Sequence, residues 1–224
     1  MPCDIGYRSW AVITIPKPTY QKFKKKVSPP KVDTDLLSKI GEDDPEFLDW
    51  LNGLDVQPLL KEALKRAKKQ VRGSSSLRCS VLADGSLVMT GKYADSRKRG
   101  NLENLSEDIS RRYQMEVLAI VAELLEYDIR ITERGDTLIL EGEKHQDGTQ
   151  VHRYFKVTMD ASGRGEIRFE HFSSPSARDA ELNKFVGLAQ LLGVRIDVQG
   201  IQEAGKPIAE GEIHHDFLKG QEGS

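Results

Sequence analysis

Hydrophobic and polar residues alternate along several short segments of this chain and recur at helical spacing in others. The alternation predicts a first strand over residues 7 to 15 and hairpins over residues 77 to 93, 128 to 144 and 151 to 172. Helical spacing predicts helices over residues 55 to 72, from about 104 to 125 and from 174 to 192. Because hairpins dominate and helices separate them, the pattern predicts an α+β fold.

Turn and capping residues refine these boundaries. Asp84-Gly85 favours a tight two-residue turn, and Ser162-Gly163 marks the turn of the later hairpin. Asp55 is a candidate helix cap. Residues 18 to 54 are mixed, with a short basic helix expected over 19 to 27 and a helical turn or two before residue 53.

Two parts of the chain repeat the order hairpin, helix, strand, over residues 77 to 132 and 153 to 199. Five positions near the helix ends correspond one to one: Ala122, Leu124, Leu125, Ile129 and Ile131 with Ala189, Leu191, Leu192, Ile196 and Val198. We therefore expect two related ββαβ modules, each a small three-stranded sheet packed by one helix, that pair to bury apolar surface. The alternative is that any amphipathic helix entering a strand shows such a pattern.

This interpretation divides the chain into four parts. A strand and a basic helical segment, the helical N-terminal insertion, occupy residues 1–76. The first module, with an extra hairpin strand, covers 77–150, and the second covers 151–203. A polar tail is expected over 204–224.

Charge is unevenly distributed along the 224 residues. Residues 1 to 100 hold 19 Lys and Arg against 12 Asp and Glu, and the remainder holds 14 against 23. Such asymmetry either holds two parts of the molecule together or offers the basic half to an anionic partner. The only cysteines, Cys3 and Cys79, cannot build a disulfide framework, and the sequence has no bilayer-spanning apolar run or secretory signal. We expect a cytoplasmic protein that does not bind membranes.

Candidate catalytic chemistry is sparse. The sequence contains no nucleophile elbow, zinc-protease helix, phosphate-binding loop or paired-cysteine motif. His145 and His152 flank a turn with Asp147, where nothing brings them together as zinc requires, and His171 sits on the same side of a strand as apolar residues. We expect no cofactor and no metal. A small hydrolase or nuclease that uses His145 or His171 remains an alternative.

Clusters of basic residues are more prominent than the candidate catalytic residues. They lie before residue 27, on the polar face of the helix over 55 to 72, and in the loop before residue 100. As a nucleic-acid-binding set they are Lys24, Lys25, Lys26, Lys65, Lys69, Arg97, Lys98 and Arg99. Few aromatic residues are interleaved, which favours contact with the phosphate backbone over base reading. The alternative is an ordinary solvated surface.

Two segments resemble a known group of proteins. "SWAVITI" near the start and "ISRRYQMEVLAIVAELLEYDIRITERGDTLILEG" over 109 to 142 resemble the Ycf-type family of uncharacterised bacterial, cyanobacterial and plastid reading frames. The hairpin and helix ending in "LLGVRIDV" resemble a short companion family. Such proteins are often encoded beside an AAA+ ATPase. The resemblance implies an accessory protein that engages such an ATPase or another macromolecule, and it implies no catalytic residues.

The leading hypothesis is therefore a non-catalytic cytosolic binding or adaptor protein that acts in a macromolecular complex. A nucleic-acid-binding protein that uses the basic N-terminal half is the first alternative. The oligomeric state does not follow from the sequence.

Overall fold

The protein is a mixed α+β structure. The computed structural model describes residues 7–14, 28–90, 96–145, 152–172 and 174–203. In these ranges, antiparallel strands form a six-stranded sheet and a separate two-stranded sheet, and five α-helices accompany them. The α+β prediction is confirmed.

The large sheet has the strand order β4-β5-β6-β7-β1-β8. The successive hairpins β4 (Asp128–Arg134) to β5 (Thr137–His145) and β6 (His152–Met159) to β7 (Gly165–Glu170) supply four neighbouring strands. The first strand, β1 (Tyr7–Thr14), lies between β7 and β8 (Arg195–Glu203) and is antiparallel to both. The sheet is therefore completed by strands from opposite ends of the described chain.

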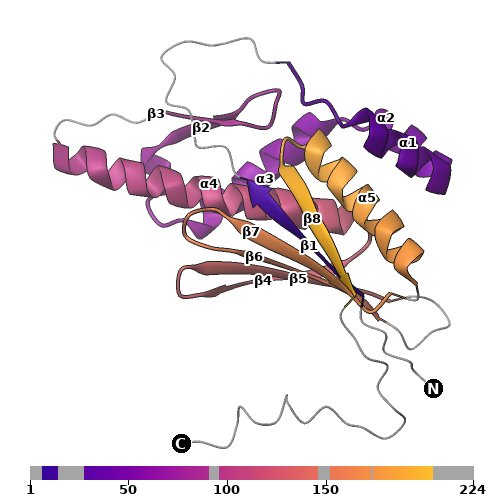
Figure 1. The fold of residues 1–224 in the computed structure, drawn as a ribbon. Helices are drawn as coiled ribbons and strands as arrows, with labels where there is room; N and C mark the ends of the chain where they lie inside the picture. Colours follow the sequence, from indigo (N-terminus) through magenta and orange to yellow (C-terminus); the bar gives the residue numbers. More distant parts are fainter. Residues whose placement is uncertain (1–6, 15–27, 91–95, 146–151, 173, 204–224) are drawn as a thin grey trace, which may run out of the picture.

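The helices lie along one face of the large sheet (Figure 1). Both α4 (Ser96–Leu124) and α5 (Pro175–Leu191) pack on the sheet, α3 (Val56–Gln70) packs on α4, and α1 (Thr34–Asp43) packs on α5. Buried residues of all these layers form one hydrophobic cluster. Its centre holds the rings of Phe155, Phe169 and Phe185, whose centroids lie 5.5 to 5.9 Å apart.

The pairing of strands corrects the prediction of two three-stranded sheets. The hairpin β2 (Arg78–Val81) to β3 (Leu87–Thr90) forms the two-stranded sheet by itself, whereas β4, the strand of the same predicted module, belongs to the large sheet. In the second predicted module, β1 separates β7 from β8. The internal duplication is therefore not confirmed, and the domain division based on it stays a prediction.

The β2–β3 hairpin is held to the rest of the molecule by close backbone contact. Its turn residue Gly85 meets Gly193, just after α5, and an ideal Cβ on Gly85 would lie 2.5 Å from the carbonyl oxygen of Leu192. The buried Tyr113 hydroxyl of α4 donates a hydrogen bond to the Gly85 carbonyl at 2.9 Å. Both glycines have positive φ, 78° and 82°, so space and backbone conformation both call for glycine.

The two predicted hairpin turns are real but longer than the two-residue turn expected at Asp84-Gly85. Gly85 donates to the Leu82 carbonyl at 3.1 Å, and Leu82 donates to Ser86 at 2.9 Å. This is a three-residue loop in which only the glycine needs positive φ. The loop ending at Gly163 has the same hydrogen bonds, so Asp84, like Ser162, keeps an ordinary backbone conformation.

The helical regions agree with the sequence in part. The cap at Asp55 and the helix after it are confirmed, as is a short helix α2 (Pro45–Asn52). The helix α1 was not predicted, because its short apolar stripe is interrupted by Gly41, which accommodates Leu48. The long helix α4 begins at Ser96 rather than near residue 104, since the segment expected as a basic loop contains good helix formers. The expected helix over 19 to 27 and the tail over 204 to 224 lie outside the described residues.

Across the described ranges, none of the helices combines the length and apolar character that crossing a bilayer requires.

Candidate functional site

The structure places the predicted nucleic-acid-binding residues in separate elements. Residues 24–26 lie outside the described chain. Residues 97–99 form the beginning of α4, at the end of that helix that projects past the other helices (Figure 1), and only their backbone is described. Lys65 and Lys69 lie one turn apart on the exposed side of α3, in line with Lys61. The structure thus brings together the lysines of α3 among the described side chains of this set.

Part of the positive charge of α3 is paired within the protein. Lys65 lies 3.0 Å from Glu62, although its side chain stays 63% exposed. Arg66 turns toward α4 and contacts Glu123 at 2.7 Å. Glu116 of α4, which is buried, accepts a hydrogen bond from Gln70. Charge asymmetry therefore helps to join α3 to the acidic side of α4, which is one of the two roles expected from the sequence.

Burial sets the ionisation of Glu116. Removal from water raises the pKa of its carboxyl, whereas the Gln70 hydrogen bond and the nearby Arg66 guanidinium lower it. Burial is the larger effect, so the pKa of Glu116 lies above its ordinary value. Arg66 approaches Glu116 only to 3.9 Å, and its closer partner is Glu123. This group is explained by the packing of two helices.

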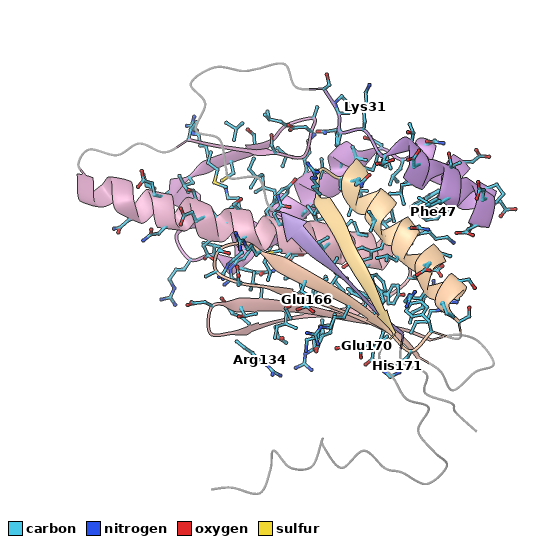
Figure 2. The ribbon with its side chains drawn as sticks, viewed as in Figure 1. Lys31, Phe47, Arg134, Glu166, Glu170 and His171 are labelled. Carbon is cyan, nitrogen blue, oxygen red and sulfur yellow. The ribbon has the colours of Figure 1, made fainter. Side chains whose placement is uncertain are left out.

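The histidines occupy two different places at the sheet. His145 and His152 are direct partners in the β5–β6 register, so the pairing of these strands sets their backbones opposite each other, which the sequence did not predict; only their backbone is described. His171 follows β7 instead of lying inside it, and its φ of 65° turns the chain (Figure 2). The prediction that His171 continues the strand beside apolar residues is wrong for this reason. Within the described residues, His, Cys, Asp and Glu form no group suited to hold a metal ion. The hypothesis of a hydrolase or nuclease that uses His145 or His171 stays a prediction.

A pocket that sequence reasoning did not predict lies where α2, the end of α4, β5 and α5 meet. Its volume is about 230 Å³. Trp50 stands in its wall with 41% of its surface exposed, and its ring centroid lies 5.3 Å from that of Phe47. The remaining lining is Leu124, Leu125, Glu126, Lys144, Glu181 and Lys184. We call this the Trp50 pocket.

The wall formed by α2 and α5 is built around a helix cap. Asp44 caps α2 by accepting a hydrogen bond from the Phe47 amide at 2.9 Å, and its other oxygen contacts Lys184 at 2.5 Å. These two hydrogen bonds hold the pKa of Asp44 below its ordinary value. Lys184 also lies over the Phe47 ring, 5.0 Å from its centroid. Phe47 is thereby fixed between α2 and α5 (Figure 2).

The opposite wall is formed by the end of α4 and by β5. Lys144 donates to the Leu125 carbonyl at 2.9 Å and lies 3.4 Å from the Glu126 carboxylate. Glu126 has a φ of 65°, a conformation that usually favours glycine, and its side chain is 83% exposed. Both pocket lysines are therefore already paired with acceptors of the protein.

Glu181 lines the pocket and is almost fully buried. Its side chain is 6% exposed, and its Oε2 receives the Arg153 guanidinium at 3.2 Å. Its Oε1 is buried and makes no hydrogen bond within the described structure. Burial raises the pKa of Tyr127, and so do the charge of Glu181 and the approach of the Tyr127 phenol to its carboxylate. Oε1 is therefore out of contact with solvent, close to the Tyr127 phenol.

Two sequence signals point to parts of this pocket. In "EFLDWLNG", helical spacing places Trp50 away from the buried Leu51, which leaves an exposed tryptophan. Lys184 and Glu181 are polar residues spaced three apart in a largely apolar helix. Their meeting with Lys144 of β5 depends on the tertiary packing and has no local signal.

Comparisons with protein-family models, with curated proteins and with solved structures find no match to this chain.

Proposed function

We propose that the chain is a non-catalytic binding or adaptor protein of a macromolecular complex, and that it contacts its protein partner at the Trp50 pocket. The observation that carries this proposal is the exposure of Trp50 beside an open pocket. Tryptophan is enriched among the few residues that supply most of the binding energy of protein interfaces. Among the side chains that the structure describes, Trp50 is the large hydrophobic one that is exposed.

The surroundings of Trp50 suit such a contact. An apolar centre with a polar, charged border is the usual composition of a protein interface. Here Trp50 and Phe47 are bordered by Lys184, Lys144 and Glu126. The pocket is pre-formed by a capped helix and by ion pairs, which lowers the conformational entropy lost when a partner binds.

An AAA+ ATPase is the partner class that the Ycf-type resemblance suggests, and we propose it as the first to be tested. The cytoplasm is the proposed location, because two cysteines in 224 residues suit a reducing compartment.

The test is affinity purification from the native host with the wild-type chain, Trp50→Ala and Lys39→Ala. Lys39 is exposed on α1 and serves as the matched surface control. We expect wild type and Lys39→Ala to retain the same macromolecular partner at moderate salt, and Trp50→Ala to lose it. The partner is then purified and titrated against all three proteins by calorimetry, where the tryptophan variant should bind at least tenfold more weakly. Equal binding by Trp50→Ala, or no partner at low salt, would contradict the proposal.

Nucleic-acid binding is the second candidate, and it is supported by the line of exposed lysines Lys61, Lys65 and Lys69 on α3. Three such charges favour the phosphate backbone, and each phosphate contact changes the slope of log K against log salt by about −0.9. We expect a Lys61/Lys65/Lys69→Gln variant to reduce both affinity and slope in a fluorescence titration with duplex DNA and single-stranded RNA. Lys156→Gln on the opposite face of the sheet is the control. A binding constant that does not respond to salt would exclude this candidate.

A further inference from the structure

We propose that two copies of the chain join edge to edge through β4, which pairs antiparallel with β4 of the second copy about a two-fold axis at Ile131. The large sheets of the two copies then form one continuous sheet. We call this contact the β4 seam. The seam uses none of the residues that line the Trp50 pocket, so it is independent of the proposed function.

The strand β4 is one of the two edges of the large sheet (Figure 1). Within the described residues it pairs with β5 alone, so the backbone groups on its outer side have no strand partner. An open edge pairs readily with another chain, and proteins often prevent this with a proline or a β-bulge. The strand β4 has neither, and its register with β5 runs without a shift from Asp128 to Arg134. The other edge strand, β8, has a register shift against β1. Of the two edges, β4 is therefore better suited to continue the sheet.

The charges of β4 are ordered so that a second copy complements them. In antiparallel pairing about Ile131, Asp128 lies opposite the partner's Arg134 at both ends of the seam. In between, Arg130 lies opposite the partner's Thr132, and Ile131 lies opposite its own counterpart. Asp128 and Arg134 are both exposed, and neither forms a salt bridge within the described structure. The two-fold pairing therefore supplies two ion pairs that a single chain lacks.

The register of β4 with β5 shows why Asp128 favours a cation on its outer side. Asp128 lies directly opposite Glu143, and like charges opposite each other destabilise a pair of strands. Arg134, at the other end of β4, lies opposite the uncharged Thr137. The β4 seam would place the partner's Arg134 beside the acidic pair. It would thereby relieve an unfavourable contact inside each sheet.

The face of β4 toward the helices also suits a second strand. Ile129 and Ile131 pack against the hydrophobic cluster but are only half-buried, so the seam would cover apolar surface that is still exposed. Glu133 lies on the same face and is paired with Arg112 at 2.8 Å. It therefore brings no uncompensated charge to the seam.

The test of self-association is sedimentation velocity of the full chain over a range of concentrations. We expect an equilibrium between monomer and dimer with a Kd on the order of 10 μM, because a seam of two short strands is a small interface. A chain that stays monomeric at about 1 mM would overturn the proposal. Growth beyond the dimer would also overturn it, since a two-fold contact is closed after two copies.

Charge reversal locates the seam. Asp128→Arg sets two arginines against each other at both ends, and Arg134→Asp sets two aspartates there, so each variant should dimerise about tenfold more weakly. An equimolar mixture of the two variants restores both ion pairs and should form a heterodimer about as strong as the wild-type dimer. Asp43→Arg of α1 and Arg72→Asp after α3 carry the same charge changes at exposed positions and are the controls. They should change nothing, alone or mixed.

Equal dimerisation of wild type and either β4 variant, or a mixture of the two that stays monomeric, would overturn the seam. Hydrogen exchange supplies a second readout, because the amides of β4 should gain protection as the concentration rises and those of β8 should not. Protection gained in β8 alone would assign the contact to the other edge. Trp50→Ala should dimerise like wild type, so failure of the seam and failure of the adaptor function are distinguishable.

Discussion

The segments β2–β3–α4–β4 and β6–β7–α5–β8 have the same order of elements but different positions in the fold. Their helix ends match bond for bond. The backbone amide of Tyr127 donates to the Ala122 carbonyl at 3.0 Å, and the backbone amide of Val194 donates to the Ala189 carbonyl at 2.8 Å. Both hairpins also turn through the same three-residue loop. Local sequence therefore determines both the turns and the helix ends in these two regions.

The difference between the regions lies in what each hairpin pairs with. The β6–β7 hairpin continues the large sheet, whereas the β2–β3 hairpin stands apart from β4. The helix α4 has 29 residues and α5 has 17, so at about 1.5 Å per residue α4 is about 18 Å longer. A longer connection separates the first hairpin from the strand that follows it. Equal local patterns thus give equal turns and helix ends in the two regions, whereas tertiary contacts decide which strands pair.

Replacement of Gly193 should have the largest effect, because this glycine joins the two regions. Gly193→Ala adds a methyl group against the backbone of Asp84 at a φ of 82°. We expect a loss of about 3 kcal/mol in the free energy of unfolding, measured by urea denaturation. Gly135→Ala is the matched control, since its φ is also positive, 58°, but no atom lies within 4 Å; it should cost about 1 kcal/mol. Equal losses would show that the close contact contributes nothing.

Removal of the Tyr113 hydroxyl should have the next largest effect. Tyr113→Phe leaves the buried Gly85 carbonyl without its donor and should destabilise the protein by about 1–2 kcal/mol. Hydrogen exchange should show the loss of protection in β2–β3 and not in β6–β7. Tyr154→Phe is the control, because its partner Glu141 stays paired with Lys156 at 3.1 Å. An equal loss of protection in β2–β3 and β6–β7 would contradict the view that the Tyr113 hydroxyl anchors the β2–β3 hairpin alone.

Exchange of Glu126 for glycine should stabilise the protein. Glu126 occupies the position that corresponds to Gly193, and its φ is 65°. Glu126→Gly relieves an unfavourable backbone conformation, but glycine also increases the conformational entropy of the unfolded chain, which opposes this gain. We expect a net increase of about 0.5–1 kcal/mol in the free energy of unfolding. Glu126→Ala keeps the unfavourable conformation and loses only an exposed ion pair, so thermal melting should show no gain. A gain of equal size in both variants would assign the effect to the ion pair.

The smallest effect at any single pH should come from Glu116, which joins α4 to α3 and has no counterpart in the α5 region. Its pKa is raised in the folded protein, so the folded state binds more protons than the unfolded state above the ordinary glutamate pKa of about 4.3. Stability should fall as pH rises through the window between these two pKa values. Glu116→Gln should flatten this slope in urea titrations at several pH values, and an unchanged slope would exclude Glu116 as its source.

Much of the local structure follows from the sequence, and the remainder depends on distant residues. The positions of the turns at Gly85 and Gly163, the cap at Asp55 and the two helix ends were predictable because each depends on a few neighbouring residues. The place of β1 between β7 and β8 was not, since alternation predicts a strand without its neighbours. The helix α1 was missed because a short helix next to prolines and glycine depends on packing against α5.

The candidate site was less predictable than the fold. Of the basic residues singled out by sequence, the structure gathers the lysines of α3 among the described side chains. Trp50 carries a signal, an aromatic residue on the polar side of a short helix. Glu181 carries none, because its burial beside Arg153 of a different strand depends on the tertiary packing.

The insertion of β1 has a consequence for synthesis on the ribosome. Both neighbours of β1 are synthesised long after it, because β1 ends at Thr14 and β7 begins only at Gly165. During synthesis β1 therefore has no partner strand until β7 and β8 have left the exit tunnel. Closure of the sheet at this point joins residues far apart in sequence, which slows folding. A nascent chain interrupted before β7 therefore carries β1 as an unpaired strand, whose open edge favours aggregation.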